Sequence, residues 1–154
     1  MTFHYEDKLT VVFAEKVSIF FDRLRKTYDF RLESGGILMG TLNRGPIITV
    51  TDVSLPYPKD VRGKYRFKRV DPMHQSLMDQ LWEESNYQKM YLGEWHTHLE
   101  KIPTPSRTDI CGWQLKSQEK KNAPWLLFLI LGKESLRLWT VDGHETKELI
   151  SDAE

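Results

Sequence analysis

The first part of the chain shows a strand pattern followed by a helix pattern. Leu9 to Phe13 is a short run rich in β-branched and apolar residues, which is typical of a strand. Apolar residues then recur at helical spacing, at Val17, Phe20, Phe21, Leu24 and Tyr28. We therefore expect the fold to open with a strand and an amphipathic helix.

Two apolar segments with many β-branched residues follow, Gly35 to Leu42 and Pro46 to Leu55. They are separated by Asn43-Arg44-Gly45, a sequence that favours a hairpin turn. The pattern predicts that these two segments pair as antiparallel strands.

The rest of the chain alternates between the two patterns. Further strands are predicted at Lys64 to Lys68, Met90 to His98, Trp125 to Leu131, Ser135 to Val141 and Glu145 to Ile150. Helices are predicted from about Asp71 to Ser85 and from Ser106 to about Ser117. This order indicates an α/β fold in which helices flank a mixed sheet in layers, as a single domain over residues 1–154.

Two expectations concern which side chains are buried. In the helix from Asp71 to Ser85, Met73, Leu77 and Leu81 are expected to face inward, with Met78 and Trp82 as further candidates. The continuous apolar run from Trp125 to Leu131 is typical of a central strand that is buried on both faces.

Composition narrows the class of protein. The 22 basic and 22 acidic residues cancel, so no overall field favours nucleic acid or a membrane surface as a partner. Cys111 is the only cysteine, which excludes an internal disulfide and fits a reducing compartment. No apolar run is long enough to span a bilayer, and Met1 to Glu15 lacks the core of a signal peptide. We therefore expect a cytoplasmic protein.

The segment Glu94-Trp95-His96-Thr97-His98 carries the clearest chemical signal. Residues two apart on a strand point to the same face, so both imidazoles can approach one ion. A catalytic zinc ion needs a third protein ligand and an open position for water. Asp109 is the candidate third ligand, because it lies in the first turn of the helix that Ser106 begins, where the helix dipole favours a carboxylate.

A metal site of this kind lowers the pKa of water, but a base must still move the proton to the leaving group. Glu33 is one candidate, since it precedes a run of small residues, Ser34 to Gly40, that would let the backbone pass close to the site. Glu94 is the other, because it shares the face of His96 and His98. Spacing alone does not separate the two glutamates.

The whole set resembles the signature of the JAB/JAMM (MPN, Mov34/PAD-1) metallopeptidases. A glutamate is followed by Gly36 and Gly40, then by His-x-His, seven residues, Ser and, three positions on, Asp. The resemblance extends from about Thr10 to Leu131. It implies a layered α/β sandwich of the cytidine-deaminase-like type and a zinc metallopeptidase activity.

The same resemblance assigns roles to individual residues. It implies that His96, His98 and Asp109 bind one catalytic Zn²⁺ ion, that Glu33 rather than Glu94 is the base, and that Ser106 helps to stabilise the tetrahedral intermediate. Ser106 and Asp109 also have the spacing of a helix-capping pair, a role compatible with catalysis.

Local segments point to a narrower group within the family. Tyr65-Arg66-Phe67 and Leu92 to His98 are similar to segments of bacterial deconjugating peptidases from antiphage (CBASS) operons. Those relatives act beside a fused E1-E2-like enzyme and a cyclic-oligonucleotide synthase. The resemblance implies a protein substrate that is engaged through its C-terminal tail, and hydrolysis of the amide or isopeptide bond joining the synthase C-terminus to its target.

Two features separate this chain from other relatives. Many of them carry proline directly after the second histidine, where this chain has Leu99, and its prolines come later at Pro103 and Pro105. The long insertions with which eukaryotic members bind ubiquitin are absent, so ubiquitin is not the expected substrate.

The sequence also bears on three other functions. An inactive MPN scaffold is disfavoured by the complete ligand set. A peptidase that trims sulfur-carrier or ubiquitin-like precursors stays open, because the sequence does not define the substrate. A zinc nucleoside deaminase is disfavoured, since its paired cysteines are missing.

The remaining reactive residue types have simpler interpretations. His4, His74 and His144 are expected to be surface or hydrogen-bonded core residues without a chemical role. Cys111 is expected to be a small buried hydrophobe. The basic residues between Lys59 and Arg69 could contact an acidic substrate tail, but a solvated strand face is the favoured interpretation.

Overall fold

The computed structural model describes residues 1–119 and 123–152, and within these it contains three helices and ten strands. The helices are α1 (Glu15–Thr27), α2 (Met73–Glu84) and α3 (Arg107–Ser117). The strands are β1 (Thr2–Tyr5), β2 (Leu9–Phe13), β3 (Gly35–Asn43), β4 (Ile47–Val53), β5 (Val61–Gly63), β6 (Arg66–Lys68), β7 (Met90–Thr97), β8 (Leu127–Leu131), β9 (Leu136–Asp142) and β10 (Glu145–Ser151).

Eight strands form one mixed sheet in the order β1-β10-β9-β8-β7-β3-β4-β2. The pairs β7–β8 and β2–β4 are parallel, and the others are antiparallel. Because β1 pairs with both β10 and β2, the sheet closes into a barrel. The predicted mixed sheet with flanking helices is confirmed, whereas the cytidine-deaminase-like layered description is not.

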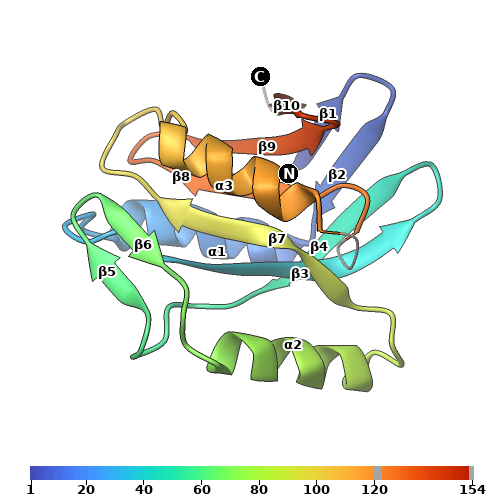
Figure 1. Ribbon diagram of the computed structural model, residues 1–154, viewed down its shortest axis with the longest axis horizontal. Helices are drawn as coiled ribbons and strands as arrows, with labels where there is room; N and C mark the ends of the chain where they lie inside the picture. The colour runs from blue at the N-terminus through green and yellow to red at the C-terminus, as the bar shows by residue number, and fades with distance from the viewer. Residues whose placement is uncertain (120–122, 153–154) are drawn as a thin grey trace.

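The helices take separate places around this sheet. Figure 1 shows α1 behind the strands β7 and β3, α3 in front of β8, and α2 below β3. Strands β5 and β6 form a two-stranded hairpin of their own at one end of the molecule. Among the described residues, no helix has the length and apolar character needed to cross a membrane.

Each helix packs at least one apolar side chain against the sheet. Val17 and Phe21 of α1 join the largest apolar cluster, together with side chains of most strands of the barrel. Trp113 of α3 stacks on Phe128 of β8 with 4.9 Å between ring centroids. Met78 of α2 packs against β3. Strand β8 is buried at every position, as its continuous apolar run predicts.

The inward face of α2 was predicted only in part. Met78 is buried and Leu77 and Leu81 are partly buried, but Met73 and Trp82 are 50% and 47% exposed. The buried residue of the first turn is His74, which shares the inward face with Met78 one turn later. Met73 and Trp82 therefore lie off the inward face of α2 and are exposed to solvent.

The long loop between β4 and α2 carries the β5–β6 hairpin and is closed at its base by Asp60. The Asp60 carboxylate accepts hydrogen bonds from the backbone N–H groups of Tyr57, Val70 and Asp71, at 2.8 to 2.9 Å. It also lies 2.6 Å from Nε2 of the buried His74. The two ends of the loop are thus held together by one buried carboxylate.

Candidate metal centre

His96 and His98 lie at the end of β7, a strand held on both sides. His96 is paired with Gly35 of β3 and with Ile130 of β8. The backbone N–H of His98, one residue past the strand, donates to the carbonyl of Leu131 at 3.0 Å. The two Nε2 atoms are 3.0 Å apart, so the imidazoles converge as the strand spacing predicts.

Asp109 of α3 completes a group of three possible metal ligands. Its Oδ1 is 3.4 Å from Nε2 of His96, and its Oδ2 is 3.2 Å from Nε2 of His98. One ligand atom from each of the three residues lies within 4.8 Å of the others. Two imidazoles and one carboxylate form a donor set that fits zinc and leaves a position open.

The helix start places Asp109. The Ser106 hydroxyl accepts a hydrogen bond from the Asp109 N–H at 3.1 Å, and the Ser106 N–H donates to Oδ2 of Asp109 at 2.9 Å. This reciprocal pair is a capping box, so the predicted capping role of Ser106 is confirmed. One oxygen of Asp109 is thereby fixed while the carboxylate faces the histidines.

Electrostatics couple the three residues. Burial alone would raise the pKa of Asp109, but hydrogen bonds with His96 and His98 outweigh it and hold that pKa well below its usual range. Burial alone would lower the pKa of His98, yet its contacts with Asp109 and Glu100 raise it to about 9. The carboxylate of Asp109 thus favours a positive charge beside it, and a divalent cation bound by the three residues would supply that charge.

Glu33 lies in the same cavity, in the segment between α1 and β3. The residue is 9% exposed, and burial raises the pKa of its carboxyl while the nearby His96 and His98 oppose that shift. Its carboxylate makes no hydrogen bond or ion pair within residues 1–119 and 123–152. A buried carboxyl with a raised pKa is suited to accept and return a proton.

Glu94, the competing candidate, also lines this cavity but is engaged by two cations. Its Oε2 lies 3.2 Å from Nζ of Lys116 and 3.7 Å from Nη2 of Arg69. The Glu33 carboxylate, by contrast, has no lysine or arginine partner among the described residues, and Glu33 stays the base that the resemblance implies.

The glycines after Glu33 are required by the packing of neighbouring strands, rather than by the metal group (His96, His98 and Asp109). A Cβ atom on Gly35 would lie 2.6 Å from the ring of Phe67, and one on Gly36 would lie 2.1 Å from the Ser54 carbonyl oxygen. The glycines therefore let the β5–β6 hairpin and the end of β4 close over β3.

Glu100 is a site residue that the sequence did not reveal. Its Oε1 lies 2.8 Å from Nδ1 of His98 and also accepts a longer hydrogen bond from the Thr104 N–H. A carboxylate on the second nitrogen of a histidine fixes its tautomer and leaves Nε2 free to bind a metal. The available signal was an acidic residue two positions after the second histidine, in the loop that departs from the family pattern at Leu99.

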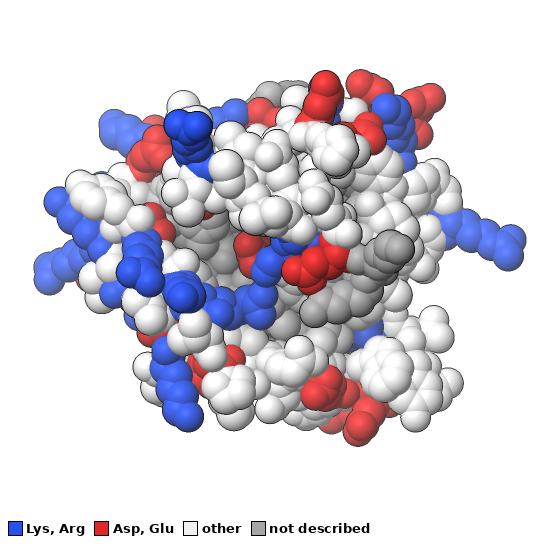
Figure 2. All heavy atoms as spheres, viewed as in Figure 1, with Lys and Arg blue, Asp and Glu red and all other residues white. Residues whose placement is uncertain are grey.

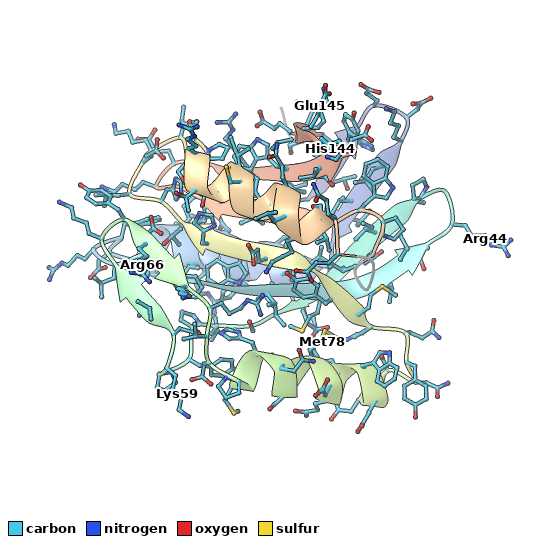
Figure 3. All side chains as sticks on the ribbon, viewed as in Figure 1. Arg44, Lys59, Arg66, Met78, His144 and Glu145 are labelled. Carbon is cyan, nitrogen blue, oxygen red and sulfur yellow. The ribbon has the colours of Figure 1, made fainter. Side chains whose placement is uncertain are left out.

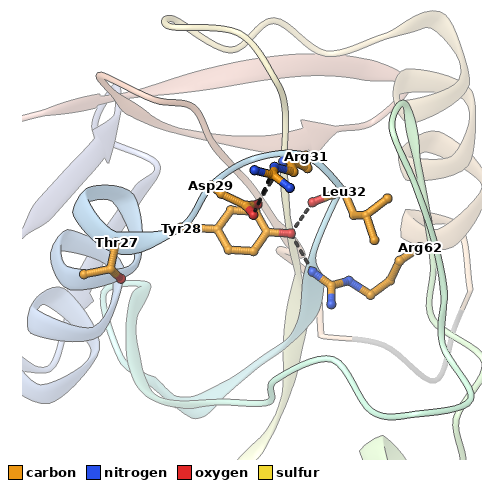
Figure 4. A pocket seen from close by; sticks show the side chains of 6 residues that line it. All are labelled: Thr27, Tyr28, Asp29, Arg31, Leu32 and Arg62. Atoms are coloured by element: carbon orange, nitrogen blue, oxygen red, sulfur yellow. Dashed lines mark hydrogen bonds and ion pairs between the residues drawn. The ribbon is translucent and has the colours of Figure 1, made fainter.

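The metal group, Ser106 and both glutamates share one cavity of about 1030 Å³. The segment from Tyr65 to Arg69, which includes β6, lines the same cavity. A smaller cavity of about 440 Å³ is lined by residues that include Tyr28, Leu32 and Arg62 of β5 (Figure 4). The Arg62 guanidinium donates to the Tyr28 hydroxyl, which in turn donates to the Leu32 carbonyl.

Other reactive residues lie outside the metal group. Cys111 is exposed, contrary to expectation, because it is two positions from the buried Trp113 and so faces nearly the opposite side of α3. His74 is a hydrogen-bonded core residue, with Nδ1 2.6 Å from the Ser54 hydroxyl. His4 contacts Thr10 and Asp152, and His144 is exposed. None of the three lies in the cavity of the metal group.

Comparisons with known proteins give a consistent result. Residues 18–142 match the family described as prokaryotic homologs of the JAB domain. A protein of Escherichia coli strain TW11681 named CD-NTase/cGAS isopeptidase is 32% identical over 90% of this chain and 86% of its own length. A protein of the same name from Vibrio cholerae serotype O1 is 35% identical over 82% of this chain and 76% of its own.

Two further comparisons extend this pattern. A protein of Pseudomonas aeruginosa with the same name is 30% identical over 82% of this chain and 79% of its own. The solution structure of protein DSY2949 from Desulfitobacterium hafniense covers 90% of this chain with a TM-score of 0.62 at 17% identity, and 88% of that protein is matched. At this identity the second likeness concerns the fold alone.

Proposed function

This chain belongs to the family of prokaryotic JAB-domain homologues, and from that membership we propose that it is a zinc-dependent isopeptidase. Its reaction would be hydrolysis of the amide or isopeptide bond between the C-terminus of a conjugated protein and its target. The observation that carries this proposal is the convergence of His96, His98 and Asp109 beside the buried Glu33 in one cavity.

In this proposal His96, His98 and Asp109 hold the zinc ion. When bound, zinc acidifies water and polarises the carbonyl of the scissile bond. Glu100 holds the imidazole of His98 in the orientation that binding requires, since it contacts the nitrogen on the far side of the ring. Ser106 fixes Asp109 through the capping box.

Glu33 moves the proton. Its carboxylate accepts a proton from the attacking water and later donates it to the amine of the leaving lysine or α-amino group. The burial that raises the pKa of Glu33 makes its carboxylate a stronger base than a solvated glutamate, and so a better acceptor of the proton from water.

Ser106 has a second part in the proposal. Its hydroxyl, at the rim of the same cavity, stabilises the oxyanion of the tetrahedral intermediate. The removal of one such donor in other enzymes slows turnover about 100- to 1000-fold.

The substrate is proposed from the relatives. Three of them, each at least 30% identical, bear the name CD-NTase/cGAS isopeptidase. We propose that this chain likewise releases a cyclic-oligonucleotide synthase from targets to which an E1-E2-like enzyme has joined it, within a cytoplasmic antiphage system.

The test is cleavage of a synthase tail fused through its C-terminus to a reporter protein, followed by gel mobility. Parent, Glu33→Gln and chelator-treated samples are compared after each has been assayed for zinc and for a folded circular dichroism spectrum. Cleavage at the junction by the zinc-loaded parent alone is the expected result. Equal cleavage by a folded, zinc-loaded Glu33→Gln variant would refute the assignment of the base.

Two negative outcomes of this test are informative. Stoichiometric zinc without cleavage would favour the processing of another precursor, such as a sulfur carrier. A folded parent that retains no zinc after purification without chelators would favour a scaffold role.

A further inference from the structure

The cavity that contains the metal group is also lined by several cations. Strand β6 and the residue after it contribute Arg66, Lys68 and Arg69, and Lys116 of α3 lies on the same cavity. In the space-filling view, basic side chains gather over the hairpin side of the molecule and continue toward the centre of the face (Figure 2). Arg66 is labelled on the hairpin in Figure 3.

The two faces of β6 have different surroundings, since one packs against β3 and the other is solvated. Phe67 is partly buried and lies against Gly35 of β3, so it holds the hairpin to the body of the protein. Arg66 and Lys68, on either side of it, share the opposite face of the strand. Both are exposed, as expected for a solvated face, yet both also line the cavity of the metal group.

Two of the four cations are already compensated and two are not. Arg69 and Lys116 share the carboxylate of Glu94. By contrast, the side chains of Arg66 and Lys68 form no hydrogen bond or ion pair with any residue that the structure describes. The rim of the cavity therefore presents two positive charges without an internal counter-charge.

The lining of the cavity thus contains two groups of unlike charge. The carboxylates of Glu33, Glu100 and Asp109 line it together with His96 and His98. The four cations on the same lining are accompanied by the single further carboxylate of Glu94. A bound peptide would lower its energy by placing acidic side chains along β6 and its scissile carbonyl at the metal group.

We infer that Arg66 and Lys68 form a subsite for acidic side chains, which selects peptide tails that carry Asp or Glu within a few residues of the scissile bond. This inference rests on the proposed peptidase function and specifies its substrate. A peptide is favoured over other polyanions because the cations border a cavity with a hydrolytic group rather than an open surface.

The hairpin also fixes this subsite relative to the base. The Glu33 N–H donates to the Gly63 carbonyl at 2.7 Å, and Nε of Arg62 donates to the Glu33 carbonyl at 3.0 Å. A tail held by β6 is therefore held at a set position from Glu33.

The experiment measures binding without turnover. Three fluorescein-labelled ten-residue peptides share one sequence except at two positions, which carry Glu, Ala or Lys. Their affinities for the zinc-loaded Glu33→Gln protein are measured by fluorescence anisotropy at low and at physiological salt. The Glu peptide is expected to bind about five-fold tighter than the Ala peptide at low salt, and less so as salt screens the charges.

Variants then locate the preference. The Arg66→Glu/Lys68→Glu protein should prefer the Lys peptide, and the Arg66→Ala/Lys68→Ala protein should show no preference. Arg44→Glu, in the exposed turn between β3 and β4, is the matched control and should behave like the parent. Zinc content and melting temperature verify that each variant is intact.

Equal affinity for the three peptides, or a preference that survives charge reversal, would overturn the subsite. An oligonucleotide of equal charge that binds as tightly as the Glu peptide would also overturn it, because the rim would then be a general polyanion surface. Since the readout is binding and not cleavage, failure of the proposed peptidase activity would leave this result unchanged. Cleavage of the same peptides by the parent tests that activity separately.

Discussion

Arg62 on β5 reaches the backbone of Glu33, with its Nε 3.0 Å from the Glu33 carbonyl oxygen. The same guanidinium donates to the hydroxyl of Tyr28, just after α1, and lies over its ring. One side chain therefore connects the hairpin, the end of the first helix and the segment that bears the proposed base. The position of Glu33 depends on a residue that does not enter the metal group.

Replacement of Arg62 should impair catalysis without loss of zinc. In Arg62→Ala the Glu33 segment loses a charge-assisted hydrogen bond, so the carboxylate should occupy its reactive position less often and kcat should fall about ten-fold. Steady-state kinetics of tail cleavage and elemental analysis measure the two quantities. Arg31→Ala, at an exposed arginine of the same region, is the control and should keep the parental kcat.

Removal of the Glu100 carboxylate should weaken metal binding. Glu100→Gln loses the charge that faces Nδ1 of His98, and the loss of such an outer partner lowers metal affinity about 10- to 100-fold. Competition with a chromophoric chelator measures the zinc affinity. Glu134→Gln alters an exposed carboxylate that pairs with Lys101 and should leave the affinity unchanged. Equal affinities of the two variants would contradict the role of Glu100.

The two roles of Ser106 can be separated by two substitutions. Ser106→Ala removes the cap and should lower the free energy of unfolding by about 1 kcal/mol, whereas Ser106→Gly should cost only a few tenths. Both remove the hydroxyl, so both should slow turnover about 100-fold or more if it stabilises the oxyanion. Urea unfolding and kcat provide the two readouts. Turnover that follows stability rather than the hydroxyl would limit Ser106 to capping.

Acid should weaken the fold through Asp52. Burial alone would raise the pKa of Asp52, but hydrogen bonds from Lys16 and Lys89 outweigh it and lower the pKa from 3.8 to about 2. A carboxyl with a lowered pKa stabilises the folded state above its unfolded pKa, and this contribution disappears as pH falls from about 4 to 2.

The Asp52→Asn variant should therefore be about 1 to 2 kcal/mol less stable than the parent at pH 7. The difference should shrink as pH falls from about 4 to 2. Urea unfolding at several pH values measures it. A difference that is constant between pH 7 and pH 2 would show that the substitution acts through packing rather than charge.

Local patterns predicted most elements and the convergence of His96 and His98. The spacing of His96 and His98 on a strand, and of Ser106 and Asp109 at a helix start, depends only on residues close in sequence, and the structure shows the geometry that this spacing predicts. Most strands and helices after Leu9 were also predicted, with differences of a few residues at the ends, but β5 was not. The single strand expected at Lys64 to Lys68 is instead the turn and second strand of the β5–β6 hairpin.

Features that depend on distant pairing were not predicted. Strand β1 has only four residues, too few for a clear alternation, and it exists because it pairs with both β2 and β10. Glu100 and Arg62 act through contacts with His98 and with the Glu33 backbone that no local pattern encodes. The exposure of Cys111 followed from the placement of Trp113, which sets the inward face of α3.

Closure of the main sheet by β1 also affects how extended chains meet this protein. The edge strand of an open sheet presents a row of unpaired backbone groups, with which a flexible polypeptide can pair as an extra strand. In the ring of eight strands those groups are already occupied by β1, β2 and β10. Among the described residues, the β5–β6 hairpin beside the cavity is therefore the sheet that is not closed, and an extended chain would meet its strand edges rather than those of the main sheet.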